Sequence, residues 1–155
     1  MENILLVDDD KYILDILSEL LKRWGYNPIK AASGEEALEK LEEISVDLVI
    51  TDIVMPEMDG YALINKILEK YPDTIIIVLT GYPSFDSAVQ SIRGGAYDFL
   101  AKPVNSEELK MKIERCIERK NLLKSKSVLK GFNWILIISI PFWLILGIIL
   151  AYLLK

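Results

Sequence analysis

The sequence contains no histidine and a single cysteine, Cys116. One cysteine cannot form a disulfide within the chain, and a zinc site needs several spaced cysteine or histidine ligands. The amino terminus lacks a basic segment before its first apolar run, which extends only from Ile4 to Val7. These absences exclude a disulfide-rich scaffold and a zinc-binding module, and they predict that there is no secretory signal peptide.

Basic residues are scarce over most of the chain. Met1 to Leu109 contains 21 acidic and 9 basic residues, a net charge of about −12, whereas Lys110 to Lys155 contains 2 acidic and 9 basic residues, about +7. A nucleic-acid partner requires clustered Lys and Arg that displace counterions from phosphates. The charge pattern therefore predicts no nucleic-acid partner and indicates that the two segments face different surroundings.

Short apolar runs recur through the first hundred residues, separated by stretches in which apolar residues have helical spacing, as from Ile13 to Leu21. Runs that are apolar on both faces are typical of strands buried between two helical layers, and repeated strand–helix units produce a parallel sheet. The sequence therefore predicts a doubly wound α/β fold with five parallel strands. The expected strands cover residues 4–7, 28–32, 48–51, 75–79 and 97–100.

Capping residues precede the expected helices. Ser33 lies three residues before Glu36, in the pattern of a capping box, and Asp10 and Asp59 each stand directly before a helical stretch. We interpret Asp10 as a helix N-cap rather than a metal ligand. The fifth helix is expected to begin after Asn105 or Ser106 and to end near residue 123.

Acidic residues follow two of the expected strands. Asp8 and Asp9 come directly after the strand that ends at Val7, and Asp52 follows the strand that ends at Thr51. In an open parallel sheet functional groups gather beyond the carboxyl ends of the strands, so the three carboxylates converge if these strands are neighbours. Two carboxylates about 4 Å apart repel by roughly 4 kcal/mol at an effective dielectric constant near 20. Such a cluster therefore predicts a bound cation, and oxygen ligands favour Mg²⁺.

Two further polar residues are expected at the same edge of the sheet. The fourth strand ends at Thr80, and the fifth is followed by Lys102. A carboxylate can attack a phosphoryl group covalently, while a metal ion and a lysine neutralise the phosphoryl oxygens and a hydroxyl group orients them. The residue set therefore suits the formation of an acyl phosphate.

Four segments, each placed at the end of a different expected strand, resemble the motifs of response-regulator receiver domains of two-component systems (CheY-like). The resemblance covers about residues 1–119 and implies a flavodoxin-like (βα)5 fold. The segments are Leu6-Val7-Asp8-Asp9-Asp10, Thr51-Asp52-Ile53-Val54-Met55-Pro56-Glu57-Met58-Asp59-Gly60, Leu79-Thr80-Gly81 and Ala96-Tyr97-Asp98-Phe99-Leu100-Ala101-Lys102-Pro103.

The resemblance implies a role for each residue of the acidic edge. Asp52 would be the phosphorylated aspartate, Asp9 a direct Mg²⁺ ligand, and Asp8 an acid that holds the metal, often through water. The backbone carbonyl of Val54 would complete the protein ligands.

The resemblance also implies roles for residues around that edge. Lys102 would pair with the phosphoryl group or with Asp52, and Thr80 would bond a phosphoryl oxygen after phosphorylation. Phe99 occupies the aromatic switch position, and Pro103 would follow a cis peptide bond.

A long uncharged segment ends the chain. Residues 132–154 form a run of 23 residues without a charge, which as a helix would span roughly 34 Å. We predict a receiver domain over residues 1–121, a basic linker over 122–131 and a transmembrane helix over 132–154. The basic residues before this run predict a single-pass protein of the inner (cytoplasmic) membrane with the receiver in the cytoplasm. Gly147-x-x-x-Ala151 suggests a homodimer through a small-residue helix face.

The expected function is that of a phosphoacceptor in a two-component phosphorelay. Since the chain contains no histidine, the phosphohistidine must lie on a sensor histidine kinase or phosphotransfer protein. The chain would signal through protein contacts at the membrane and would catalyse only its own phosphorylation and dephosphorylation. One alternative is a phosphate sink or passive membrane anchor for a kinase. Another is a Mg²⁺-dependent phosphatase, which is disfavoured because Val54 replaces the second acid of such enzymes.

Overall fold

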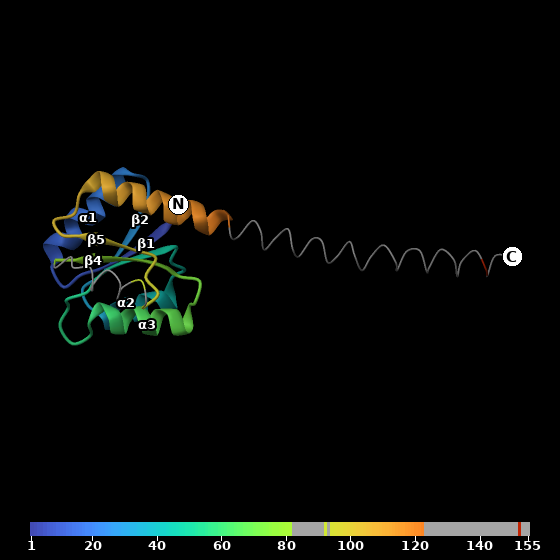
Figure 1. The fold of residues 1–155 in the computed structure, drawn as a ribbon, viewed down its shortest axis with the longest axis horizontal. Helices are drawn as coiled ribbons and strands as arrows, with labels where there is room; N and C mark the ends of the chain where they lie inside the picture. The colour runs from blue at the N-terminus through green and yellow to red at the C-terminus, as the bar shows by residue number, and fades with distance from the viewer. Residues whose placement is uncertain (82–91, 93, 123–151, 153–155) are drawn as a thin grey trace. The chain divides into compact units, whose positions relative to one another are not determined.

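The computed structural model describes residues 1–81, 92, 94–122 and 152 (Figure 1). Strands and helices alternate from residue 3 to residue 80, a fifth strand lies at residues 98–101, and a further helix covers residues 106–122. Met1–Ile117 forms one compact unit. The labelled elements are β1 (Asn3–Val7), α1 (Lys11–Arg23), β2 (Asn27–Ala31), α2 (Gly34–Glu43), β3 (Leu48–Asp52), α3 (Gly60–Lys70), β4 (Ile75–Thr80) and β5 (Asp98–Ala101).

The five strands form one parallel sheet in the order β2-β1-β3-β4-β5. The predicted five-stranded parallel α/β fold is therefore confirmed, with strand bounds that differ from the expected ones by at most one residue. The order reverses direction at β1, because the chain passes from β1 outward to β2 and then returns across β1 to β3. In the β1–β3 pair Val7 lies opposite Thr51, so the residues that follow these two strands emerge side by side.

Helices cover both faces of the sheet (Figure 1). Buried residues of α1 and of the helix over residues 106–122 pack on one face, and buried residues of α2 and α3 pack on the other. Along β1, Ile4 and Leu6 pack on the face covered by α1 and the helix over residues 106–122, whereas Leu5 and Val7 pack on the face covered by α2 and α3. This arrangement explains why the central strands β1, β3 and β4 are buried and mostly apolar, since neither face of these strands meets water.

The helices begin at the predicted capping residues. The hydroxyl of Ser33 accepts a hydrogen bond from the backbone N–H of Glu36 at 3.1 Å. The side-chain oxygen of Asn105 accepts hydrogen bonds from the backbone N–H groups of Glu107 and Glu108. Asp10 and Asp59 cap α1 and α3 in the same way. The interpretation of Asp10 as an N-cap is therefore confirmed, and its side chain is occupied in starting a helix.

The described helices are not membrane helices. Among residues 1–81, 92, 94–122 and 152, none is long and apolar enough to cross a bilayer, because each has one apolar face packed on the sheet and charged residues on its outer face. The predicted transmembrane segment over residues 132–154 lies outside the described residues apart from Tyr152, as do linker residues 123–131 and the small-residue pattern considered for a homodimer.

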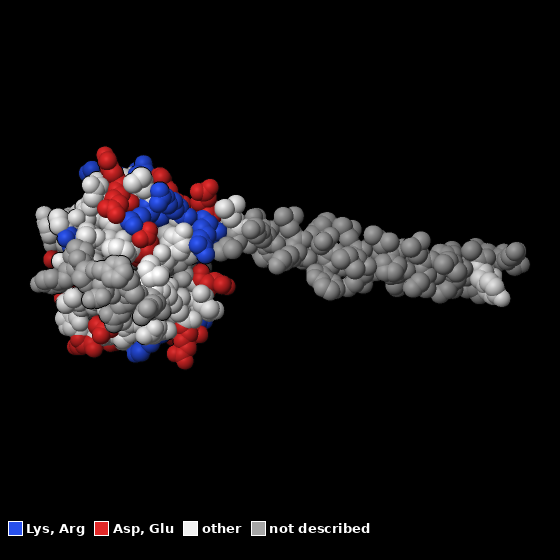
Figure 2. Space-filling view, viewed as in Figure 1, with Lys and Arg blue, Asp and Glu red and all other residues white. Residues whose placement is uncertain are grey.

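Charge is unevenly distributed over the described surface. Figure 2 shows Lys and Arg atoms gathered on the side of the molecule that carries the helix over residues 106–122, while Asp and Glu atoms are spread around the visible face. This helix contains five of the basic residues described in the chain, Lys110, Lys112, Arg115, Arg119 and Lys120.

Candidate functional site: the acidic edge of the sheet

Three carboxylates meet at the carboxyl ends of β1 and β3. One side-chain oxygen from each of Asp8, Asp9 and Asp52 lies within 4.8 Å of the other two. Asp8 and Asp52 are only 1% and 6% exposed, whereas Asp9 is exposed. The sequence prediction that these residues converge is therefore confirmed, and the physical cause is the adjacency of β1 and β3 in the sheet.

Lys102, which directly follows the edge strand β5, connects that strand to this cluster. Its ammonium donates hydrogen bonds to Asp8 Oδ2 and to Asp52 Oδ2, each at 2.7 Å. The backbone N–H of Lys102 donates to the carbonyl of Thr80 at 2.7 Å, which joins the end of β5 to the end of β4. The peptide bond between Lys102 and Pro103 is cis, as the resemblance implied. One lysine thus pairs with two buried acids from different strands.

Backbone N–H groups orient the two buried carboxylates. Asp52 Oδ1 accepts from the N–H of Ile53 at 2.7 Å, and Asp8 Oδ1 accepts from the N–H of Asp10 at 3.0 Å. Each acid therefore has one oxygen held by the backbone and the other by Lys102. Both carboxylates are oriented before any ligand binds.

Burial and the hydrogen-bonded charges have opposite effects on the pKa values of Asp8 and Lys102. Burial raises the pKa of Asp8 above its usual value, although the hydrogen bonds from Lys102 and from the N–H of Asp10 oppose it. For Lys102 burial acts to lower the pKa, but the hydrogen bonds to Asp52 and Asp8 outweigh it and raise the pKa. The lysine therefore stays cationic at neutral pH.

The donor chemistry of the edge fits Mg²⁺. Three carboxylates face a single ammonium, so the cluster keeps an excess of negative charge when all four groups are ionised. Two of the acids are almost fully buried, where water screens their repulsion poorly. Oxygen donors with uncompensated negative charge are the ligands that a hard divalent cation prefers.

The remaining predicted site residues lie around this cluster. Val54 lies two residues after the end of β3 and is 64% exposed, whereas Thr80 is the last residue of β4 and is 4% exposed. Thr80 pairs in register with Ala101, directly before Lys102. Phe99 lies on β5 partly buried against the core cluster on the α2–α3 face. The structure thus brings Asp8, Asp9, Asp52 and Lys102 together and places Thr80 on the neighbouring strand end, with Phe99 further back along β5.

Sequence reasoning did not identify the part that Gly60 plays. Its N–H donates to the carbonyl of Ile53 at 2.8 Å, which folds the loop after β3 back onto the strand end. A Cβ atom at this position would lie 2.3 Å from the carbonyl oxygen of Asp52, which is closer than atoms can approach. The glycine that directly follows the Asp59 cap was the available signal, because a close backbone approach favours residues without a side chain.

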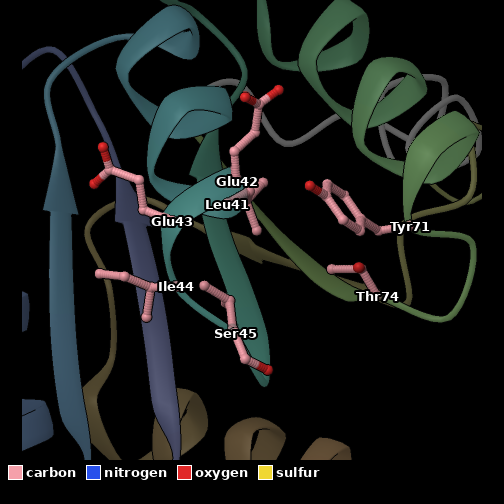
Figure 3. Close-up of a pocket in the computed structure, with 8 residues that line it drawn as sticks. Leu41, Glu42, Glu43, Ile44, Ser45, Tyr71 and Thr74 are labelled. Carbon is pink, nitrogen blue, oxygen red and sulfur yellow. The ribbon is translucent and has the colours of Figure 1, made fainter.

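A pocket of about 310 Å³ lies at the opposite edge of the sheet (Figure 3). Its walls come from the end of α2, the segment that leads into β3, and residues between α3 and β4, which all precede the amino ends of strands. It is therefore separate from the acidic edge, which lies at the carboxyl ends. The lining residues are Leu41, Glu42, Glu43, Ile44, Ser45, Val46, Tyr71 and Thr74.

The fold and the acidic edge agree with the comparison with known families. The response regulator receiver domain family matches residues 4–114 of the chain. The chain belongs to this family, as the resemblance of its motifs implied. The matched range falls inside the receiver domain predicted over residues 1–121, whose boundary stays a prediction.

The curated relatives of the chain are longer proteins that match it over one segment. The transcriptional regulatory protein ZraR of Escherichia coli K12 is 40% identical over 115 residues, which cover 74% of this chain and 26% of ZraR. A cyclic di-GMP phosphodiesterase of Thermotoga maritima is 35% identical over 117 residues, 76% of this chain and 31% of that protein. The crystal structure of a receiver domain protein from Clostridium thermocellum has a TM-score of 0.75 at 35% identity, covering 79% of this chain and 99% of that one. The chain thus spans between a quarter and a third of the curated relatives it matches.

These findings correct one prediction. The expected location, as a single-pass protein of the inner membrane, is wrong: similar proteins such as ZraR are named as transcriptional regulatory proteins, and within the described part of the chain no helix can cross a bilayer. The apolar run that prompted the prediction was judged by length and composition alone. The acidic edge needs no membrane segment, because its residues all lie between Asp8 and Lys102.

Proposed function

We propose that the chain is the phosphoacceptor of a two-component phosphorelay and that Asp52 receives the phosphoryl group. The observation that carries the proposal is the ammonium of Lys102, 2.7 Å from an oxygen of Asp52 and 2.7 Å from an oxygen of Asp8. A cation held against a buried carboxylate can stabilise the negative charge of a phosphoryl group that becomes attached to that carboxylate.

The proposed step transfers the phosphoryl group from nitrogen to oxygen. A carboxylate oxygen of Asp52 attacks the phosphorus atom and forms an O–P bond. The P–N bond to the donor imidazole breaks, and the imidazole nitrogen leaves with the electron pair of that bond. Asp52 becomes an acyl phosphate, and the donor becomes an unmodified histidine.

The neighbouring residues have separate parts in this step. Asp8, Asp9, Asp52 and the backbone carbonyl of Val54 would hold Mg²⁺, which would supply positive charge to the phosphoryl oxygens. The ammonium of Lys102 neutralises a further oxygen. The hydroxyl of Thr80, at the end of the next strand, donates to the phosphoryl group once it is attached.

The donor in this proposal is a sensor histidine kinase or a phosphotransfer protein. Receiver domains interact with such proteins, and a chain without histidine cannot supply the phosphohistidine itself. The chain catalyses only its own phosphorylation and dephosphorylation and turns over no separate substrate. Its output passes through protein contacts that change when Asp52 carries the phosphoryl group.

Incubation of the full chain with Mg²⁺ and acetyl phosphate tests the proposal. The wild type is expected to gain the mass of one phosphoryl group, and Asp52→Ala is expected to gain none. Asp73→Ala is the matched control, because it removes an exposed aspartate before β4, away from the acidic edge. An unmodified wild type, or an Asp52→Ala variant that is modified as fast as the wild type, would contradict the proposal.

A further inference from the structure

Lys112 makes an ion pair beside the aromatic residue of β5. This lysine lies on the helix over residues 106–122, and its ammonium is 2.7 Å from Asp98 Oδ1 and 3.8 Å from Glu108 Oε1. The side chains of Lys112 and Asp98 are 17% and 27% exposed. An ion pair this sheltered is less screened by solvent than the Lys110–Glu114 pair of the same helix, whose side chains are 47% and 57% exposed.

The same ion pair holds both the backbone and the ring of Phe99. Asp98 Oδ1 accepts a hydrogen bond from the N–H of Phe99 at 2.8 Å as well as from Lys112. The ammonium of Lys112 also lies 5.8 Å from the centroid of the Phe99 ring, within the range of a cation–π contact. Asp98 and Lys112 therefore contact Phe99 at its backbone and its ring, in addition to its packing against the core.

Phe99 is in turn connected to the acidic edge through the sheet. Three residues further along the chain, Lys102 bridges Asp8 and Asp52. Phe99 itself lies opposite Val78 of β4, the strand that ends at Thr80. The Phe99 ring and the Lys102 ammonium thus belong to one short segment, β5 and the residue that follows it.

We infer that Lys112 is a positioning residue that holds the Phe99 ring in the unphosphorylated arrangement and so limits how readily the site converts when Asp52 is modified. The inference rests on the proposed function, since it concerns the response of that site. We call the arrangement that the site adopts when Asp52 is modified the converted arrangement. If a ligand binds only the converted arrangement, its apparent affinity falls in proportion to the fraction of molecules in that arrangement. Loss of the Lys112 contacts removes interactions from the unphosphorylated arrangement alone and raises the population of the converted one.

Beryllofluoride, a stable mimic of the phosphoryl group, is a suitable probe in the presence of Mg²⁺. Lys112→Met is expected to lower the beryllofluoride concentration at half-saturation by about 3- to 10-fold, equivalent to about 0.7–1.4 kcal/mol. Loss of a positive charge alone would act in the opposite direction, because it weakens the attraction for an anion. General destabilisation of the fold would also raise this midpoint, the beryllofluoride concentration at half-saturation. A lowered midpoint therefore distinguishes the inference from a charge effect and from general destabilisation.

The experiment uses the full chain labelled with 4-fluorophenylalanine. The sequence has four phenylalanines, so the fluorine spectrum has few lines, and Phe99→Leu identifies the line of Phe99. Lys112→Arg retains a cation and is expected to behave like the wild type. Lys110→Met is the matched control, since it removes an equal charge from the same helix at a lysine that is 47% exposed and paired only loosely with Glu114, at 4.0 Å.

The outcomes separate the two proposals. A shifted Phe99 line in the ligand-free Lys112→Met variant, together with a lower midpoint that Lys110→Met does not reproduce, supports the inference. If the wild type responds to beryllofluoride but Lys112→Met has the wild-type line and midpoint, the inference is overturned and the phosphoacceptor proposal stands. If Lys110→Met gives the same change, the inference is likewise overturned. A wild type that does not respond to beryllofluoride overturns both.

Discussion

Removal of the Lys102 ammonium is expected to destabilise the protein in the absence of Mg²⁺. Its two carboxylate contacts are both 2.7 Å long, and Lys102→Met leaves the acids of the cluster without a compensating charge. The oxygens of the three carboxylates lie within 4.8 Å of one another, and two unit charges at that distance repel by about 3.5 kcal/mol at an effective dielectric constant near 20. Loss of one partner of a buried ion pair costs about 3–5 kcal/mol. Because the lysine side chain is 21% exposed, we expect a loss at the lower end, about 3 kcal/mol.

Mg²⁺ is expected to reverse much of this loss. The ion and the lysine compete for the same negative charge, so Lys102→Met should bind Mg²⁺ more tightly than the wild type. A tenfold gain in affinity adds about 1.4 kcal/mol of stability at saturating ion. Urea unfolding followed by circular dichroism, in EDTA and in MgCl₂, measures both effects. Equal stability of the variant and the wild type in EDTA, or equal stabilisation of both by Mg²⁺, would refute the reasoning.

The pH dependence of the same variant follows from Asp8. Burial holds its pKa above the unfolded value of 3.8, so its negative charge opposes folding at neutral pH and its protonation favours the folded state. Without Lys102 the pKa of Asp8 should rise further. The difference in stability between wild type and Lys102→Met in EDTA should therefore shrink as the pH falls from 8 toward 5, and a difference that grows would contradict this assignment.

Three other substitutions test separate parts of the account. Asp8→Asn should raise stability in EDTA, because it removes a buried charge, and should abolish most stabilisation by Mg²⁺; unchanged stabilisation by Mg²⁺ would contradict the ligand assignment. Ser18→Ala should stabilise the protein by about 1 kcal/mol, since the buried Ser18 hydroxyl has no hydrogen-bond partner among the described residues and alanine favours helix. Gly60→Ala should cost about 1–3 kcal/mol and slow modification of Asp52, because its Cβ would meet the Asp52 carbonyl oxygen at 2.3 Å; urea unfolding and the acetyl phosphate assay measure the two effects.

Most of the fold and the acidic cluster could be predicted from the sequence. The central strands β3 and β4 are short runs apolar on both faces, and helices begin at capping residues such as Ser33, so local pattern and tertiary environment agree. Acids placed directly after strands meet wherever those strands are neighbours. The position of Asp8, Asp9 and Asp52 therefore needed only the strand order, which the motifs implied.

Contacts that depend on side-chain reach could not be predicted. That one ammonium would bond Asp8 and Asp52 equally depends on the paths of three strands and of the Lys102 side chain. The contact of Lys112 with Asp98 joins a helix to a strand across 14 positions in the sequence, and no local pattern indicates it. The inner-membrane prediction failed for a different reason: a run of apolar residues measures the tendency to leave water, but it does not identify the apolar surroundings that the run enters.

The central claim is that Asp52, and no other acid of the cluster, carries the phosphoryl group. Borohydride reduces an aspartyl phosphate to homoserine and leaves free aspartate unchanged, so peptide mass analysis after treatment with Mg²⁺ and acetyl phosphate locates the modified residue. The account predicts homoserine at position 52, with Asp8 and Asp9 intact. Homoserine at position 8 or 9, or no homoserine anywhere in the chain, would contradict it.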